Sequence, residues 1–115
     1  MPNELDALLP LNPRAFYVLL SLAEEDRHGY AISKAVEQIT GGSVRLTPGT
    51  LYPLIRQLLV DGWIVELAED AEDARRRRYR LSTLGKRIAQ AEARRLDELV
   101  RVARSFRLLP AAGRA

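Results

Sequence analysis

The chain has 115 residues, of which 47% are hydrophobic and 29% charged, a length and composition typical of one small folded domain. The lack of cysteine excludes disulfides and thiol chemistry, and the single histidine, His28, argues against a multi-histidine metal site. No apolar stretch approaches the ~20 residues that cross a bilayer, and the acidic first residues do not resemble a secretory signal, so we expect a cytoplasmic protein without cofactors. The formal net charge of +3 is uneven, because residues 74–115 hold 13 basic and 3 acidic side chains.

This segregation of charge indicates a polyanion or an acidic partner for the last third of the chain. A second interpretation is a solvated basic helix in a genome that favours arginine, since 16 of the 18 cations are arginine. Charge alone leaves both interpretations open.

The first predicted helix begins at Asn12 and Pro13, a good N-cap followed by the residue that suits the first helical position. It runs over residues 14–26, and three acidic residues at its end disfavour continuation. Its apolar face is predicted to hold Phe16, Leu19, Leu20 and Ala23.

A second helix is predicted to begin at Gly29 and to end at Gly41 and Gly42. Its apolar residues recur at spacings of three and four, and they are Ile32, Ala35, Val36 and Ile39. An extended piece is expected over residues 43–46.

The third helix repeats the cap-and-proline start at Thr47 and Pro48 and ends before Gly62. Its apolar face comprises Leu51, Leu54, Ile55, Leu58 and Leu59. Two starts remain open: a helix capped by Thr47 would have Pro53 inside it, whereas a start near Thr50 would place Pro53 in the first turn.

After Gly62 the period changes to two, which predicts two strands that form a hairpin. Trp63, Val65 and Leu67 alternate in the first strand, and Tyr79 and Leu81 alternate in the second. The connecting residues 68–77 are acidic in their first half, and arginines occupy positions 75–78.

The last predicted helix begins at Ser82 or Thr83 and extends to about Leu109, before Pro110. It carries a heptad-like apolar seam of Ala89, Glu92, Leu96, Leu99, Ala103 and Phe106, thickened by Val100. A small domain offers little core to a helix ~37 Å long, so we expect much of this seam to meet another chain. The alternative is a helix that folds back on its own domain.

Three helices followed by a hairpin predict a mainly α fold with a small β-hairpin, a winged helix-turn-helix plus one long C-terminal dimerisation helix. In such a fold the third helix enters the DNA major groove and the hairpin tip reaches an adjacent groove or the backbone. We expect residues 1–82 to form the DNA-binding domain, 83–109 the dimerisation helix and 110–115 a flexible tail.

Four segments carry a more specific resemblance, and they occur in a fixed order. They are HGYAI from His28, PGTLYPLIRQL from Pro48, DGWI from Asp61 and RYRLSTLG from Arg78. Together they resemble the PadR family of bacterial transcriptional regulators, in its short subfamily. Trp63, where a smaller aliphatic residue is usual, and the arginine-rich hairpin depart from the family pattern.

The resemblance implies a homodimer that binds a palindromic promoter site, usually as a repressor. It also implies a dimer interface formed by the C-terminal helix with help from the first helix. We expect this interface to contain Phe16, Ala89, Leu96, Leu99, Val100, Ala103 and Phe106.

The candidate DNA-binding residues lie at the starts of the second and third helices and at the hairpin tip. Short hydroxyls and backbone N–H groups at a helix start can meet phosphates and base edges, and arginine suits phosphate and narrow minor grooves. The candidates are His28, Tyr30, Lys34, Thr47, Gly49, Thr50, Tyr52, Arg56, Arg75, Arg76 and Arg77.

Individual roles follow from residue type. Tyr52 is expected to be exposed, whereas the Tyr30 ring is expected to pack on the core with its hydroxyl on a phosphate. His28 serves as a helix cap or a phosphate contact. Arg56 reads a guanine or a phosphate, or is an ordinary surface cation. Trp63 belongs to the core or, alternatively, to the wall of a ligand pocket.

Arg78 and Arg80 are expected on the exposed face of their strand. No set of residues suggests an enzyme. The main alternative function is a winged helix that binds an acidic protein instead of DNA, and a small hydrophobic or aromatic effector is expected as a possible partner of the regulator.

Overall fold

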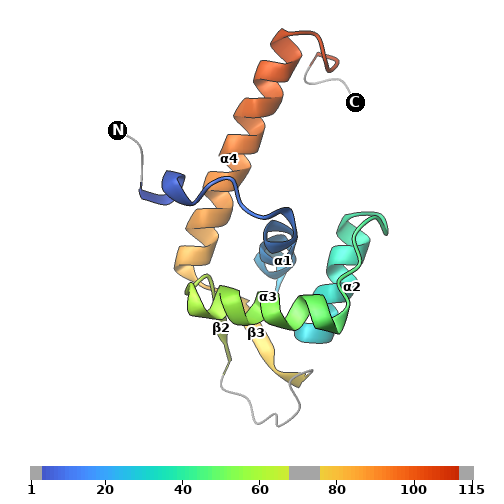
Figure 1. The fold of residues 1–115 in the computed structure, drawn as a ribbon, viewed down its shortest axis with the longest axis vertical. Coiled ribbons are helices and arrows are strands. Elements are labelled where there is room, and N and C mark those ends of the chain that lie inside the picture. The colour runs from blue at the N-terminus through green and yellow to red at the C-terminus, as the bar shows by residue number, and fades with distance from the viewer. Residues whose placement is uncertain (1–3, 68–75, 112–115) are drawn as a thin grey trace.

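The elements of the structure follow the predicted order, with one short helix and one strand added. The computed structural model describes residues 4–67 and 76–111. Its elements are a short 3-10 helix η1 (Glu4–Leu8), α1 (Pro13–Glu24), β1 (Arg27–His28), α2 (Gly29–Ile39), α3 (Pro48–Val60), β2 (Ile64–Glu66), β3 (Arg78–Leu81) and α4 (Thr83–Ser105). Figure 1 shows α4 rising from the body of the molecule, with α3 and the strands at the opposite end. The predicted fold class is confirmed.

Helix α1 begins where its cap predicts. The Asn12 side chain accepts hydrogen bonds from the backbone N–H groups of Arg14 (2.9 Å) and Ala15 (3.4 Å). The predicted apolar face was wrong in part, because Ala23 is exposed and Phe16 and Leu20 are only half-buried, whereas Leu19 is buried as expected. The sequence of α1 is apolar on nearly every side, so periodicity could not single out the face that packs, which is Ala15, Val18, Leu19 and Leu22.

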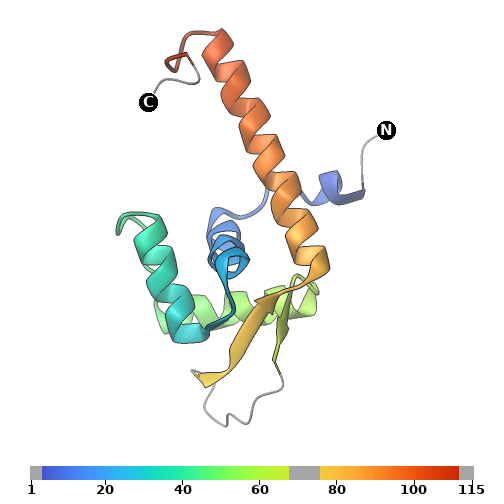
Figure 2. The same cartoon turned by 180° about the vertical axis from the view of Figure 1, so that it is seen from behind.

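The sheet has three antiparallel strands in the order β1-β3-β2, as Figure 2 shows from behind. The sequence did not predict β1, a two-residue strand that pairs with β3 through Arg27 opposite Tyr79. In β2 and β3, Ile64 and Tyr79 are buried against the helices, whereas Val65 lies on the outer side. The sheet therefore covers the core with one face only.

The structure decides between the two predicted starts of α3. It runs from Pro48, so Pro53 lies inside the helix and cannot donate to the carbonyl of Gly49. Thr47 occupies the N-cap position, but its side chain makes no capping hydrogen bond. The helix is held by its buried face, whose fully buried members are Leu51, Ile55 and Leu58.

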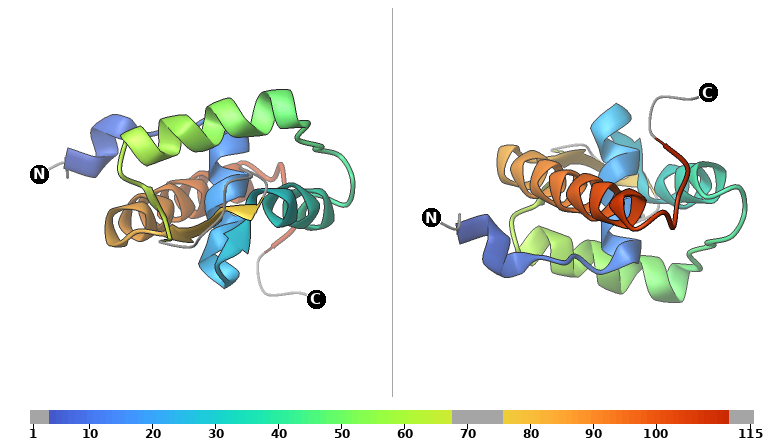
Figure 3. Two further views of the ribbon diagram at one scale, coloured as in Figure 1. Left: turned by 90° about the horizontal axis from the view of Figure 1, so that it is seen from below. Right: turned by 90° about the horizontal axis from the view of Figure 1, so that it is seen from above.

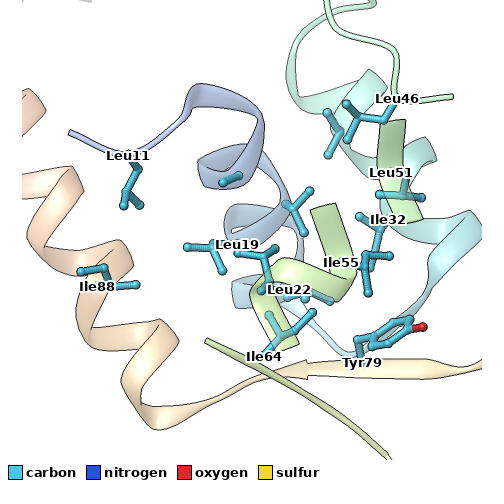
Figure 4. Close-up of a cluster of buried hydrophobic side chains, with 14 of the residues drawn as sticks. Leu11, Leu19, Leu22, Ile32, Leu46, Leu51, Ile55, Ile64, Tyr79 and Ile88 are labelled. Atoms are coloured by element: carbon cyan, nitrogen blue, oxygen red, sulfur yellow. The ribbon is translucent and has the colours of Figure 1, made fainter. Parts of the chain in front are cut away.

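A single hydrophobic core joins all four α-helices and the sheet (Figure 4). Helix α2 contributes Ile32 and Val36, whereas Ile39, predicted on the same face, is 45% exposed at the helix end. Helix α4 contributes Ile88 and Ala91 from its first half. Trp63 is half-buried and packs against this core, in agreement with the first of its two predicted roles.

Helix α4 begins after Ser82, whose hydroxyl accepts a hydrogen bond from the N–H of Gly85 (2.9 Å). It ends at Ser105, four residues before the predicted end. Arg107 has a φ of 61° and the N–H of Leu108 donates to the carbonyl of Ala103, which is a Schellman turn without glycine. The sequence signalled the later Pro110, not this turn.

Candidate nucleic-acid interface

The starts of α2 and α3 meet at the end of the molecule that lies opposite the far end of α4 (Figures 1 and 3). Tyr52 from α3 makes the contact: a Cβ placed on Gly29 would lie 2.9 Å from the Tyr52 hydroxyl oxygen and 3.0 Å from its Cε1. The expectation of an exposed Tyr52 was therefore wrong, because the ring is half-buried over Gly29 and packs against the core. Tyr52 joins the two candidate DNA-contacting helix starts into one surface.

Tyr30 and Lys34 form an exposed pair on the first turns of α2. The Tyr30 side chain is 61% exposed, so the expectation that its ring packs on the core was wrong. Instead the ring stands in solvent, with the Lys34 Nζ atom 5.4 Å from its centroid. At position i+4 the ammonium stacks on the aromatic face, and the pair presents a hydroxyl and a positive charge side by side.

The first turn of α3 presents small groups to solvent. The Thr47 and Thr50 hydroxyl oxygens are 3.3 Å apart. Gly49 is exposed, and a Cβ added to it would meet no atom within 4 Å. Pro48 has no N–H, and the N–H of Thr50 donates to the carbonyl of Thr47 at 3.0 Å, so this turn leaves the N–H of Gly49 to an approaching anion.

His28 and Arg56 are both exposed on the same surface. His28 occupies the N-cap position of α2, in agreement with the first of its two predicted roles, although its side chain makes no capping hydrogen bond. Its backbone is extended because it pairs with Arg78 in the sheet. Arg56 lies one helical turn beyond Tyr52 on α3.

The wing is defined as β2, β3 and the residues between them, and two exposed arginines lie directly before β3. Arg76 and Arg77 are exposed, and the Arg77 Nη1 lies 3.8 Å from Oε1 of Glu66, a partner too distant and too solvated to neutralise it. Arg75 and the acidic residues of the connection lie outside the described residues.

Two further arginines of β3 are engaged within the protein. Arg80 binds both carboxylate oxygens of Asp26, at 2.8 and 3.2 Å, and Arg78 lies 3.9 Å from the same group. The hydrogen bond from Arg80 holds the pKa of Asp26 below its ordinary value. Sequence reasoning missed this partner, although the alternation that places both arginines on the outer strand face was predicted correctly.

The candidate dimerisation residues divide into two groups. Ala89 packs against the core of its own protomer, and Glu92, placed in the predicted seam, is buried there with 3% exposure. Beyond Glu92 the same helix face leaves the body and is open to solvent, with Leu99 56% and Phe106 73% exposed. Leu96, Val100 and Ala103 on this stretch are half-buried.

Glu92 is a buried carboxylate whose partners the sequence did not predict. It accepts hydrogen bonds from Nε of Arg95 (2.6 Å) and from the backbone N–H of Leu11 (3.1 Å). The bond from Arg95, helped by the one from Leu11, outweighs burial and lowers the pKa of Glu92. Glu92 thus ties the segment before α1 to α4.

A groove of about 250 Å³ opens where the start of α1 meets the middle of α4. Phe16 lies in its wall. The remaining lining residues are Leu11, Pro13, Tyr17, Glu92, Arg95 and Leu96. This mostly apolar groove is continuous with the exposed stripe of α4, since Leu96 belongs to both.

The described residues hold no set of side chains suited to metal chemistry and no membrane span. Within residues 4–67 and 76–111, no three histidine, aspartate or glutamate side chains form a cluster. None of the helices in these ranges is both long and apolar enough to span a membrane.

Comparison with known proteins agrees with this arrangement. The transcriptional regulator PadR-like family model matches residues 18–91, more than half of the chain. A transcriptional regulator of Mycobacterium tuberculosis is 29% identical over 85 residues, which cover 74% of this chain and 77% of that protein. An uncharacterised protein of a Streptomyces fradiae transposon is 34% identical over 88 residues, 76% of this chain, and the chain spans only 24% of its length.

Solved structures of transcriptional regulators are also similar to this chain. A transcriptional regulator from Clostridium thermocellum is 26% identical with a TM-score of 0.67, over 80% of this chain and 90% of that one. The Bacillus subtilis PadR in complex with operator DNA shares the fold with a TM-score of 0.60 at 19% identity, over 71% of this chain and 46% of that one. The chain therefore belongs to the PadR-like family of transcriptional regulators, which are not enzymes.

Proposed function

We propose that the protein is a homodimeric repressor that reads a palindromic promoter site with α3 in the major groove. The observation that best supports this proposal is the exposed surface where α2 and α3 begin. Tyr52 fastens the two helix starts together, and Gly49 leaves open space above the first turn of α3. The positive ends of two helix dipoles and several short polar groups thus lie close together, which suits a phosphate backbone and the base edges beneath it.

The absence of a side chain at Gly49 supports an outside partner. Glycine weakens a helix by about 0.5–1 kcal/mol relative to alanine. Nothing inside the protein requires it, because a Cβ at this position would contact no atom within 4 Å and its φ is not positive. A DNA duplex that approaches the backbone of α3 closely would explain why glycine, and not alanine, occupies position 49.

The wing supports a second contact with DNA. Arg76 and Arg77 are exposed directly before β3, a strand that lies on the same end of the molecule as α3 (Figure 1). We propose that they, together with Arg75, meet phosphates or a narrow minor groove beside the major groove that α3 occupies. Arg78 and Arg80 remain with Asp26 and contribute less.

The exposed stripe of α4 supports the homodimer. Leu99, Val102 and Phe106 are each at least 45% exposed on a helix that extends beyond its own core, and an isolated helix gains its stability from packing. A second copy would cover this stripe and the groove beside Phe16. Two α3 helices must then lie ~34–36 Å apart to enter successive major grooves on one side of a duplex.

We further propose that a small hydrophobic or aromatic effector releases the DNA by changing the separation of the two α3 helices. The mostly apolar groove of about 250 Å³ beside Phe16 supports such a ligand. A regulator of this kind would act in the cytoplasm, where bacterial promoters are. The Bacillus subtilis PadR bound to operator DNA, which shares the fold, supports the direct reading of DNA.

The test is recovery of genomic fragments on the purified protein, followed by sequencing. We expect a small number of enriched fragments with a two-fold symmetric sequence, one of them upstream of the protein's own coding region. Binding of that duplex should fall by orders of magnitude between about 50 and 200 mM salt, and a shuffled duplex of equal composition should bind much more weakly. If no duplex binds at low salt, the protein is instead an adaptor for an acidic protein partner.

A further inference from the structure

We propose that Ser82 and Gly85 form a joint that fixes the direction of α4 against the end of α3, and that they are thereby positioning residues for DNA reading. The joint consists of the first turn of α4 and the Gly62–Trp63 segment that follows α3. The inference rests on the proposed homodimer, because α4 carries the contact between protomers and α3 carries the contact with DNA.

Three hydrogen bonds of Ser82 build the joint. Its hydroxyl donates to the carbonyl of Gly62 at 2.6 Å and accepts from the N–H of Gly85 at 2.9 Å. Its backbone N–H donates to the carbonyl of Trp63 at 3.1 Å. One residue therefore connects the start of α4 with the segment that leaves α3.

That segment is in turn fixed to α3. The N–H of Trp63 donates to the carbonyl of Leu58 at 3.0 Å, and the N–H of Gly62 donates to that of Leu59 at 3.1 Å. Gly62 has a φ of 77°, a conformation that favours glycine, and this directs the chain from α3 into β2. Continuous hydrogen bonds thus lead from the last turn of α3 to the first turn of α4.

Gly85 adds a steric constraint on the position of α4. A Cβ at this position would lie 1.8 Å from the carbonyl oxygen of Trp63 and 2.8 Å from its carbon. These are backbone atoms, so no side chain can rotate aside. The backbone of α4 therefore rests directly on that of Trp63, whereas Ile88 and Ala91 pack on the core through apolar, non-directional contacts. The hydrogen bond of Glu92 with Leu11 is a second directional contact, but it joins α4 to the segment before α1 and not to α3.

A small change at this joint has a large effect at the far end of α4. The helix has 23 residues. At 1.5 Å per residue it is about 35 Å long, so a tilt of about 5° moves its end by about 3 Å. In the homodimer the same tilt changes the separation and the orientation of the two α3 helices, which must match the spacing of successive major grooves. The joint therefore sets which half-site spacing the dimer accepts.

The test measures the distance between the two α3 helices directly. The chain has no cysteine, and Val60 on α3 is 81% exposed, so Val60→Cys provides one spin-label site per protomer. Pulsed electron-spin resonance of the full-length dimer then gives the distance between protomers. We expect Ser82→Ala in this background to broaden the distance distribution or to shift its mean by several ångströms.

Two further variants separate positioning from stability. Ser82→Thr keeps the hydroxyl at the N-cap and should restore the narrow distribution. Ser105→Ala makes the same chemical change on α4 but removes only a local bond to the carbonyl of Val102, and it should leave the distribution unchanged.

The possible failures are distinguishable. If Ser82→Ala lowers the melting temperature of the dimer and leaves the distance distribution unchanged, Ser82 is only a helix cap and the inference is overturned. If the labelled protein shows no distance between protomers because it is monomeric, the proposed homodimer fails, and the inference fails with it.

Discussion

Replacing Gly49 with alanine should separate the stability of the protein from its affinity for DNA. The added Cβ meets no atom within 4 Å in the isolated chain. Alanine is the better helix former by about 0.5–1 kcal/mol, so the melting temperature should stay the same or rise by about 2–5 °C. In the complex the methyl group would keep the backbone of α3 from its partner.

The decrease in affinity can be worked out from the hydrogen bonds at risk. The N–H of Gly49 can donate to a charged phosphate, because Pro48 has no N–H and that of Thr50 is bonded to the carbonyl of Thr47. Such a hydrogen bond contributes about 1.5–3 kcal/mol. Removal of one bond corresponds to about a tenfold to a hundredfold weaker complex. Fluorescence anisotropy with the recovered promoter duplex at fixed salt measures this change, and thermal unfolding by circular dichroism measures stability.

A second glycine provides the matched control. Gly41 also has open space around it, but its φ is 61°, and it lies at the far end of α2 from the proposed interface. Gly41→Ala should lower stability, because the left-handed conformation is strained for alanine, and should leave affinity unchanged. Equal affinity of Gly49→Ala and the wild type would refute the close approach of DNA to α3.

Three other changes test the wing, the dimer and the buried carboxylate. Arg76→Ala with Arg77→Ala should weaken binding to every duplex and reduce the slope of log affinity against log salt by about 0.9 for each phosphate that the wing no longer neutralises; an unchanged slope would mean that neither side chain meets phosphate. Leu99→Glu should yield folded monomers in analytical ultracentrifugation, since Leu99 is already 56% exposed in the protomer, and persistent dimers would show that the interface lies elsewhere. Glu92→Gln should cost about 1–3 kcal/mol of unfolding free energy at neutral pH. Because the folded protein lowers the pKa of Glu92, this contribution is present above the ordinary pKa and disappears as the pH falls through the lowered one, so chemical denaturation of both proteins should converge in acid.

The helix boundaries were predictable because their signals are local. Asn12 caps the backbone two and three residues onward, and Gly62 turns the chain with its own φ. Proline and glycine act through their own backbone torsions, so they need no distant partner to be recognised. There are two exceptions. The start of α3 was left open because Pro53 fits both alternatives, and the end of α4 was missed because Arg107 adopts a conformation that arginine seldom adopts.

The candidate site was predictable in its location but not in its side-chain orientations. The starts of α2 and α3 and the basic hairpin were identified from caps, spacing and charge. Whether a tyrosine lies on the core or in solvent depends on the neighbouring helix, and this is why the expectations for Tyr30 and Tyr52 were both reversed. Gly29 could have given a signal, since a glycine at a helix start leaves room for a ring.

The sequence by itself determined the order and type of the main elements, the basic wing and the apolar stripe of α4, because each depends on residues within a few turns of one another. Tertiary structure alone decided the pairing of β1 with β3, the ion pair of Asp26 with Arg80 and the hydrogen bond of Glu92 with Leu11. The partners in these two polar contacts are 54 and 81 residues apart. A periodic pattern shows which face of a helix or strand packs against another element. It cannot identify the distant residue that lies opposite, because that contact forms only when the helices pack into one core.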